Sequence, residues 1–232
     1  MRETLRPIVC LAFVLPLLLI YELGSIFANQ MSAKSGIDQW LHWFMEMAGI
    51  GHLVILPIVT TGILLHWHHK IKDQWRMHPN VLVGMLAESA CLGVILFFAG
   101  NAVCRIIAAE SELTTMAISD VQPINVWGTT ITYIGCGVYE ELVFRLMLLS
   151  GLIHAGKKYF PETELKTAAM IFTSLVFAAL HYELFNPAGA TIDVYEFLFR
   201  FSASIVFCLL FLFRGFGIAV GTHVIYDVMT QI

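Results

Sequence analysis

The chain has 232 residues, of which 58% are hydrophobic and only 13% are charged. Soluble domains carry about 25% charged residues, so this composition disfavours an ordinary soluble fold. The net charge of −4 is small and the basic residues form short clusters, which disfavours a nucleic-acid partner. With a mean hydropathy of +0.78 spread along the whole chain, the excess apolar surface is expected to face a lipid bilayer.

Seven apolar runs are predicted to be transmembrane helices, because about 20 apolar residues cross a bilayer as a helix. The first run is interpreted as a retained anchor rather than a secretory signal, since Glu22 interrupts its C-terminal part and no convincing cleavage site follows. The fourth run is longer than a span needs and the last is short, which leaves room for tilt or a re-entrant piece. The runs cover residues 7–28, 49–67, 81–104, 124–154, 167–184, 194–213 and 216–232.

Between the first two runs, residues 37–48 are predicted to form an amphipathic helix on the membrane surface. Apolar residues recur there at helical spacing against polar ones, and Trp40 and Trp43 suit the headgroup level. The predicted fold is therefore all-α: a polytopic integral membrane protein with about seven transmembrane helices and one interfacial helix. No repeat or linker divides the chain, so residues 1–232 are expected to form a single membrane domain.

The distribution of Lys and Arg predicts a cytoplasmic N-terminus in the cell membrane. With that orientation, only Lys34 and Arg105 fall outside, where the loops are acidic. The basic residues that fall inside are Arg2, Arg6, Lys70, Lys72, Arg76, Lys157, Lys158, Lys166 and Arg214.

The fourth run carries two adjacent carboxylates and an arginine. An ionisable group at the bilayer centre costs about 2.5–3.5 kcal/mol on insertion scales, so each one needs a partner or a wet cavity. Glu141 and Arg145 stand four residues apart on the helix and can form an ion pair. Glu140 points roughly 100° away from Glu141, which leaves it free for other chemistry. The alternative is a purely structural salt bridge, although one Arg cannot neutralise two carboxylates in lipid.

Two further runs carry histidines at the same spacing. Phe177 and His181 stand four apart in the fifth run, and His223 and Asp227 stand four apart in the seventh. A lone His on an apolar helix is usually a packing residue, but two of them together with a double Glu favour a shared polar cavity. A Glu and a His can deprotonate and orient a water, while a second His can donate a hydrogen bond to a developing oxyanion.

In this order on successive apolar runs, Glu140-Glu141-x-x-x-Arg145, Phe177-x-x-x-His181 and His223-x-x-x-Asp227 resemble the motifs of the CPBP family of glutamic intramembrane proteases. That family includes the Ras-converting CAAX endopeptidase and bacterial proteins linked to bacteriocin processing and immunity. The resemblance covers about residues 124–232, so it implies a catalytic core there and leaves the role of the spans in residues 1–123 unassigned.

The resemblance implies an endopeptidase without a cofactor that cleaves a membrane protein or peptide. Glu140 would activate the hydrolytic water with the help of His181, and His223 with Asp227 would stabilise the oxyanion. Glu141 and Arg145 would support Glu140, and Phe177 would pack beside His181. An ionised Asp cannot donate a hydrogen bond, so Asp227 is expected to orient His223 by accepting its Nδ1–H, or else to act as a protonated donor.

Two other functions remain open from the sequence. In a zinc-dependent protease, one Glu and two His would bind a metal, although no His-Glu-x-x-His occurs. In a non-catalytic binding protein, immunity protein or transporter, the same residues would line a polar pocket.

Some polar residues lie outside these motifs. His66, His68, His69 and His78 fit an interface belt better than a metal site. Glu22 or Glu88 could neutralise Arg200 or extend the hydrogen bonds of the cavity.

Overall fold

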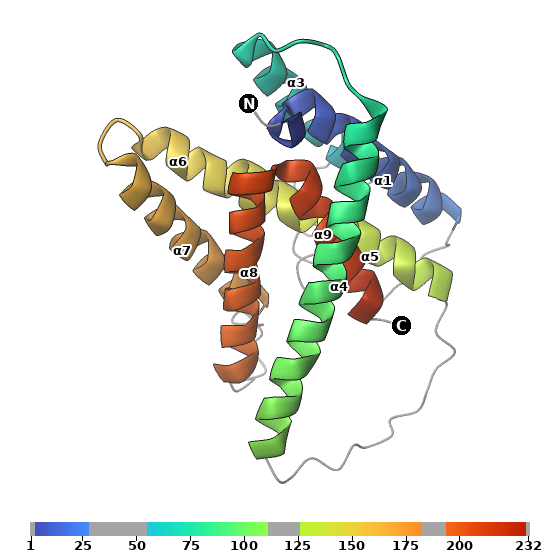
Figure 1. Ribbon diagram of the computed structural model, residues 1–232, viewed down its shortest axis with the longest axis vertical. Helices are drawn as coiled ribbons and strands as arrows, with labels where there is room; N and C mark the ends of the chain where they lie inside the picture. Colours follow the sequence, from blue (N-terminus) through green and yellow to red (C-terminus); the bar gives the residue numbers. More distant parts are fainter. Residues whose placement is uncertain (1–2, 28–54, 111–125, 182–193, 231–232) are drawn as a thin grey trace.

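The computed structural model describes residues 3–27, 55–110, 126–181 and 194–230, and these residues form helices without any strand (Figure 1). A short 3₁₀ turn, Glu3–Leu5, precedes the first long helix. Because the described residues form helices and no strand, the predicted all-α fold is confirmed. In chain order the helices are α1 (Pro7–Phe27), α3 (Ile55–Ile71), α4 (Pro79–Glu110), α5 (Val126–Glu140), a π-helical segment (Glu141–Leu149), α6 (Ser150–Gly156), α7 (Glu162–His181), α8 (Val194–Arg214) and α9 (Phe216–Thr230).

Four of these helices are long and apolar enough to cross a membrane, and their spanning parts are Pro7–Gly24, Pro79–Val103, Glu162–His181 and Val194–Arg214. This count, taken over the described ranges, is lower than the seven spans expected. The α3 helix has 17 residues and α9 has only 15, so both are shorter than a typical span. The predicted interfacial helix at 37–48 lies outside the described residues.

Helix α9 runs through the middle of the bundle, in contact with α1, α4, α5 and α8 (Figure 1). Its residues from Phe216 to Val224 are all buried, so this short helix faces protein rather than lipid. Glycines allow the close packing: a Cβ at Gly217 would come within 2.6 Å of Met85, and one at Gly221 within 2.6 Å of the Ser89 hydroxyl. These glycines therefore permit a close approach of α9 to α4 just ahead of His223.

A single residue, Gly215, turns the chain from α8 into α9. Its φ of +101° lies in a region that side chains disfavour, and a Cβ there would come within 2.4 Å of the Thr4 carbonyl oxygen. Its backbone N–H donates to the carbonyls of Leu210 and Phe211, which caps the end of α8. This turn directs α9 back between the other helices and so positions the polar residues that α9 carries.

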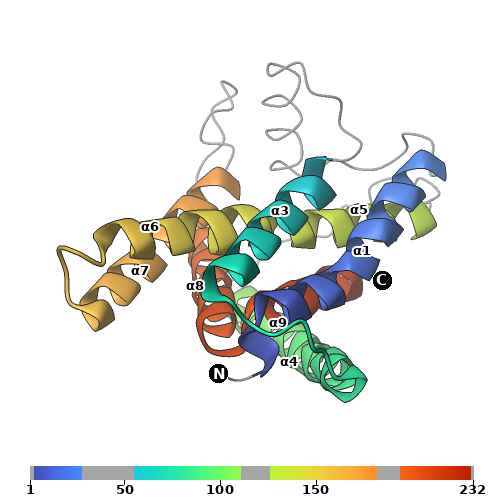
Figure 2. The same ribbon diagram turned by 90° about the horizontal axis from the view of Figure 1, so that it is seen from above.

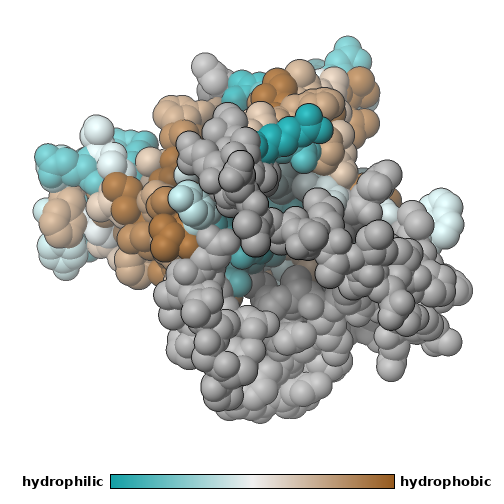
Figure 3. All heavy atoms as spheres, turned by 90° about the horizontal axis from the view of Figure 1, so that it is seen from below, coloured by the Kyte–Doolittle hydropathy of each residue, from teal (hydrophilic) through white to brown (hydrophobic). Residues whose placement is uncertain are grey.

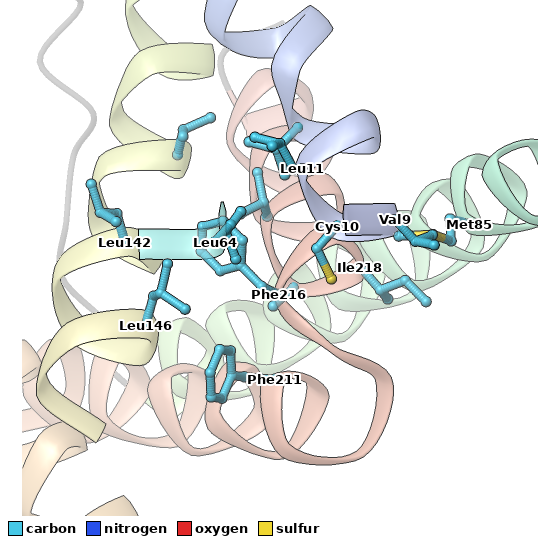
Figure 4. Close-up of a cluster of buried hydrophobic side chains, with 14 of the residues drawn as sticks. Val9, Cys10, Leu11, Leu64, Met85, Leu142, Leu146, Phe211, Phe216 and Ile218 are labelled. Carbon is cyan, nitrogen blue, oxygen red and sulfur yellow. The ribbon is translucent and has the colours of Figure 1, made fainter. Parts of the chain in front are cut away.

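The apolar core joins the N-terminal helices to the C-terminal ones (Figure 4). Val9, Cys10 and Leu11 of α1 lie in the same cluster as Leu64 of α3 and Met85 of α4. The cluster also contains side chains of the π-helical segment, of α8 and of α9, among them Leu142, Leu146, Phe211, Phe216 and Ile218. Burial of these side chains fixes α9 against α1 and α4.

At the start of α1, a polar contact links the N-terminus to the connection between α3 and α4. Helices α1 and α3 run side by side (Figure 2). Arg6 Nε donates to Asp73 at 2.6 Å, and its guanidinium also reaches the Gln74 carbonyl. The hydrogen bond from Arg6 holds the pKa of the Asp73 carboxyl below its usual range. Of the histidines assigned to an interface belt, His68 differs, because it is buried against the edge of Trp75.

Polar and apolar side chains are distributed on the surface as expected for helices that lie in a bilayer. The α6–α7 end of the molecule is hydrophilic at its tip, where Lys157, Lys158 and Glu162 are exposed, and hydrophobic nearer the centre (Figure 3). On α7, Ile171, Phe172 and Leu175 are exposed, as are many large apolar side chains of α1, α4 and α8. Exposed apolar surface of this extent is the pattern of a protein whose helices face lipid.

Candidate active site

All seven residues that the sequence singles out gather around one buried polar cluster. They come from the end of α5, the π-helical segment, the C-terminal end of α7 and the second half of α9. Only His181 and Asp227 have side chains more than a tenth exposed, at 12% and 17%. The cluster members from the sequence are Glu140, Glu141, Arg145, Phe177, His181, His223 and Asp227.

The carboxylate of Glu140 lies between two imidazoles. Its Oε1 is 3.5 Å from Nε2 of His181, and its Oε2 is 3.4 Å from Nε2 of His223. These separations are longer than a normal N–H···O hydrogen bond, so the carboxylate is close to both rings without being locked to either. The Nδ1 atom of His181 lies 2.9 Å from the Phe177 carbonyl oxygen, which leaves Nε2 as the nitrogen directed at Glu140.

Glu141 has a different role from its neighbour. Its Oε1 lies 2.7 Å from Nδ1 of His223 and 3.1 Å from Nη1 of Arg145. The predicted Glu141–Arg145 ion pair is therefore present, and both side chains are fully buried. Through Glu141, the pair also contacts the imidazole of His223.

The expectation that Asp227 accepts the Nδ1–H of His223 is wrong, because Glu141 occupies that nitrogen. Asp227 lies on the other side of the ring, with its Oδ2 3.6 Å from Nε2. The reason is the direction from which α9 meets its neighbours: the ring of His223 points its Nδ1 at the π-helical segment and its Nε2 toward Glu140 and Asp227.

The π-helical segment Glu141–Leu149 carries three of the buried side chains at the site. The backbone N–H of Ser150 bonds to the carbonyl of Arg145, five residues earlier, and the Ser150 hydroxyl donates to the same oxygen at 3.2 Å. Glu141, Phe144 and Arg145 all point into the protein from this segment. Helical turns of this wider type are rare and often occur at functional sites, and the sequence pattern did not predict this one.

Two phenylalanines connect the buried arginine to the two histidines. The guanidinium carbon of Arg145 lies 4.9 Å from the ring centre of Phe177 and 5.4 Å from that of Phe207. Phe177 packs against His181 with ring centres 4.2 Å apart, as expected, and Phe207 stacks on His223 at 4.3 Å. Arg145 thus sits between two aromatic faces, each of which also supports one imidazole.

Sequence reasoning missed the contribution of α8 to the site. The Nη2 atom of Arg145 donates to the hydroxyl of Ser204 at 3.2 Å and to its carbonyl at 3.4 Å. Phe207 comes from the same helix, one turn further on. No motif marks these residues, because a serine and a phenylalanine are ordinary in an apolar span, and only the packing of α8 against α7 and α9 reveals them.

An apolar cavity of about 320 Å³ lies between α4 and α8. Phe207, which stacks on His223, forms part of its wall, so the cavity adjoins the polar cluster. Its lining includes Ala99 and Gly100 of α4, Phe199 of α8 and Tyr226 of α9. An apolar group next to the cluster could therefore be held from this side.

The partner of Arg200 lies on the same helix as Arg200 itself. Arg200 pairs with Glu196, one turn earlier on α8, with Nη2 2.6 Å from Oε1. Glu88 pairs instead with Arg214 at the other end of α8. Of the roles that the sequence leaves open for Glu88, neutralisation of Arg200 is therefore wrong, because a partner at i−4 is available to Arg200 on its own helix.

Within the described ranges, no three histidine, cysteine, aspartate or glutamate side chains are grouped so that they could hold a metal ion. If the protein were a zinc-dependent protease, Glu140, His181 and His223 would be the residues that bind the metal.

The apolar helices and the enclosed cluster of carboxylates and imidazoles define a multi-pass membrane protein with a polar site inside its helical bundle. Residues 122–229, which contain all seven predicted site residues, match the family described as type II CAAX prenyl endopeptidase Rce1-like. This part of the chain is therefore an Rce1-like domain, and the predicted CPBP resemblance is confirmed. The family supports a protease acting on membrane-associated peptides. No curated protein and no solved structure matches the chain.

Proposed function

We propose that this protein is a glutamic intramembrane endopeptidase whose catalytic part is residues 124–232. The observation that carries the proposal is the position of Glu140, a buried carboxylate with one oxygen near Nε2 of His181 and the other near Nε2 of His223. A carboxylate in this position can accept a proton from a water that the imidazoles orient. Glu140 is also distinct from Glu141, whose carboxylate is already engaged by Arg145 and His223.

In the proposed reaction, the oxygen of the water forms a bond to the carbonyl carbon of the scissile peptide. One water proton passes to Glu140, and the carbonyl oxygen becomes an oxyanion. His223, as an imidazolium with protons on both ring nitrogens, donates from Nε2 to that oxyanion while Nδ1 faces Glu141, and Asp227 lies beside Nε2. Collapse of the intermediate breaks the C–N bond, and the proton held by Glu140 passes to the leaving amine.

The substrate would be a membrane-associated protein or peptide with an apolar group near the cleaved bond. The apolar cavity between α4 and α8 supports this, because its wall includes Phe207 and the cavity therefore reaches the ring that stacks on His223. Binding energy gained by the apolar group would position the scissile bond at Glu140.

We further propose that the protein lies in the cell membrane with its N-terminus in the cytoplasm. The support for this orientation is the excess of Lys and Arg in the segments that it places inside, nine against two.

The proposal can be tested by comparing the membrane proteomes of cells that produce the wild-type protein and the Glu140→Gln variant at equal levels. The substitution keeps the shape of the side chain and removes only its basicity. We expect at least one membrane-associated protein to be cut at a single bond in wild-type cells and to stay intact with the variant. Identical peptide termini in the two samples would count against proteolysis.

The zinc alternative is tested on the purified protein with the substrate found in this way. Cleavage by water activated through Glu140 and His181 should survive exhaustive chelation. One bound zinc per chain, with activity lost on chelation and restored only by zinc, would assign the protein to the metalloproteases instead.

A further inference from the structure

A connected series of buried polar contacts runs from Ser204 of α8 to the imidazole of His223. Ser204 accepts from Nη2 of Arg145 through both its hydroxyl and its carbonyl oxygen. Nη1 of the same guanidinium lies 3.1 Å from Glu141 Oε1, and this oxygen lies 2.7 Å from Nδ1 of His223. The side chains of Ser204, Arg145 and Glu141 are fully buried.

We propose that Ser204 is a positioning residue that acts on His223 through Arg145 and Glu141. A guanidinium is planar and presents its donors in a fixed fork, so an acceptor at one nitrogen determines where the other nitrogens point. Ser204 holds the Nη2 side of the fork, and this keeps Nη1 3.1 Å from Glu141 Oε1, where the two groups form an ion pair without a hydrogen bond. Glu141 in turn fixes the orientation of the His223 ring and keeps the Nδ1 proton in place.

Two further observations make the Ser204 contact important. The Nε and Nη1 atoms of Arg145 are buried, and neither donates a hydrogen bond to the residues that the structure describes. The aromatic faces of Phe177 and Phe207 attract the cation but do not fix its rotation in the plane. The oxygens of Ser204 therefore supply directional contacts that the rings cannot replace.

The expected effect on kcat rests on the proposed function, in which His223 donates to the oxyanion. Loss of the Ser204 hydroxyl should lower kcat by about tenfold, the order expected when one hydrogen bond to a charged group is lost. The value of KM should change little, because Ser204 does not line the apolar cavity.

The decisive experiment observes the His223 ring itself and needs no substrate. Protein with ¹⁵N-labelled histidine is placed in lipid nanodiscs, and the Nδ1 resonance of His223 is assigned by its disappearance in His223→Gln. We expect this resonance to move in Ser204→Ala and to return toward the wild-type position in Ser204→Thr, which restores a hydroxyl. In a Glu141→Gln background, adding Ser204→Ala should cause no further change, since the connection is already broken at Glu141.

Ser89→Ala is the matched control. Ser89 is also a fully buried helical serine, but it lies on α4, where its hydroxyl donates to the Ile218 carbonyl at 3.5 Å. This variant should leave the His223 resonance and kcat unchanged. An unchanged His223 resonance in Ser204→Ala would overturn the inference. A shifted resonance in a protein that cleaves no peptide would support the role of Ser204 and reject the proposed protease function.

Discussion

Two Glu–Arg pairs with the same four-residue spacing lie in opposite surroundings in this protein. Glu141 and Arg145 are fully buried, whereas the side chains of Glu196 and Arg200 are 49% and 34% exposed. The buried pair contacts a histidine, a serine and two aromatic rings, while the exposed pair bridges one turn of α8. The same local pattern thus produces a structural centre in one place and a weak surface contact in the other.

The largest effect is expected from Arg145→Ala. The substitution leaves Glu141 buried without its cation, which typically costs about 3–5 kcal/mol. We predict a clear drop in the melting temperature of the purified protein together with loss of activity. An Arg145→Ala protein that melts like the wild type would show that the buried pair is not the structural centre inferred here.

Substitutions of Asp227 test whether the carboxylate beside Nε2 of His223 contributes to turnover. Its carboxylate lies 3.6 Å from Nε2, and an Asn at this position can still accept from or donate to groups nearby. We predict that Asp227→Ala lowers kcat by about 10²–10³, the order typical of lost oxyanion stabilisation, while Asp227→Asn keeps a measurable fraction. Steady-state kinetics on the two variants provide the check, and normal turnover of Asp227→Ala would reduce the residue to a packing role.

A moderate effect is expected when the apolar cavity is filled. Ala99 lines the cavity from α4, away from the buried ion pair, so Ala99→Phe should occupy space that an apolar substrate group would use. We predict that KM rises by about tenfold, roughly the contribution of a few buried methylenes, with little change in kcat. Ala87→Phe, an exposed position of the same helix outside the cavity, is the matched control. Equal KM values for the two variants would show that the cavity does not bind the substrate.

The smallest effect is expected at the exposed pair. Arg200→Gln should change the free energy of unfolding by no more than about 0.5 kcal/mol, because exposed ion pairs contribute little. Denaturation of this variant beside Arg145→Ala gives the comparison directly. A loss at Arg200 as large as that at Arg145 would mean that burial does not distinguish the two pairs.

The sequence predicted much of the site because its signals are local or stand out in apolar surroundings. Glu140, His181 and His223 are ionisable residues in apolar runs, and such residues are costly unless they share a cavity. The partner of Arg200 was equally local, since Glu196 stands at the same spacing that identified Glu141 for Arg145. This pair is absent from the predictions made from the sequence, although the same spacing rule applies to it.

What could not be predicted depends on how helices rotate against one another. The contact of Glu141 with Nδ1 of His223 joins residues 82 positions apart, and no spacing rule fixes which nitrogen meets which carboxylate. Ser204 reaches Arg145 across 59 positions and carries no motif. Likewise, the π-helical turn after Glu140 lies within an otherwise ordinary apolar helix, so neither composition nor periodicity marked it.

We infer that the adjacent carboxylates Glu140 and Glu141 have different tasks, one chemical and one structural. The most direct test measures kcat and the melting temperature of purified Glu140→Gln and Glu141→Gln side by side. We predict that the Glu140→Gln protein has no turnover and melts like the wild type, because both rings near residue 140 keep their other contacts. Glu141→Gln should lower the melting temperature as well as kcat, since Arg145 and His223 lose their shared anion. Substantial turnover by Glu140→Gln would show that Glu140 is not the base.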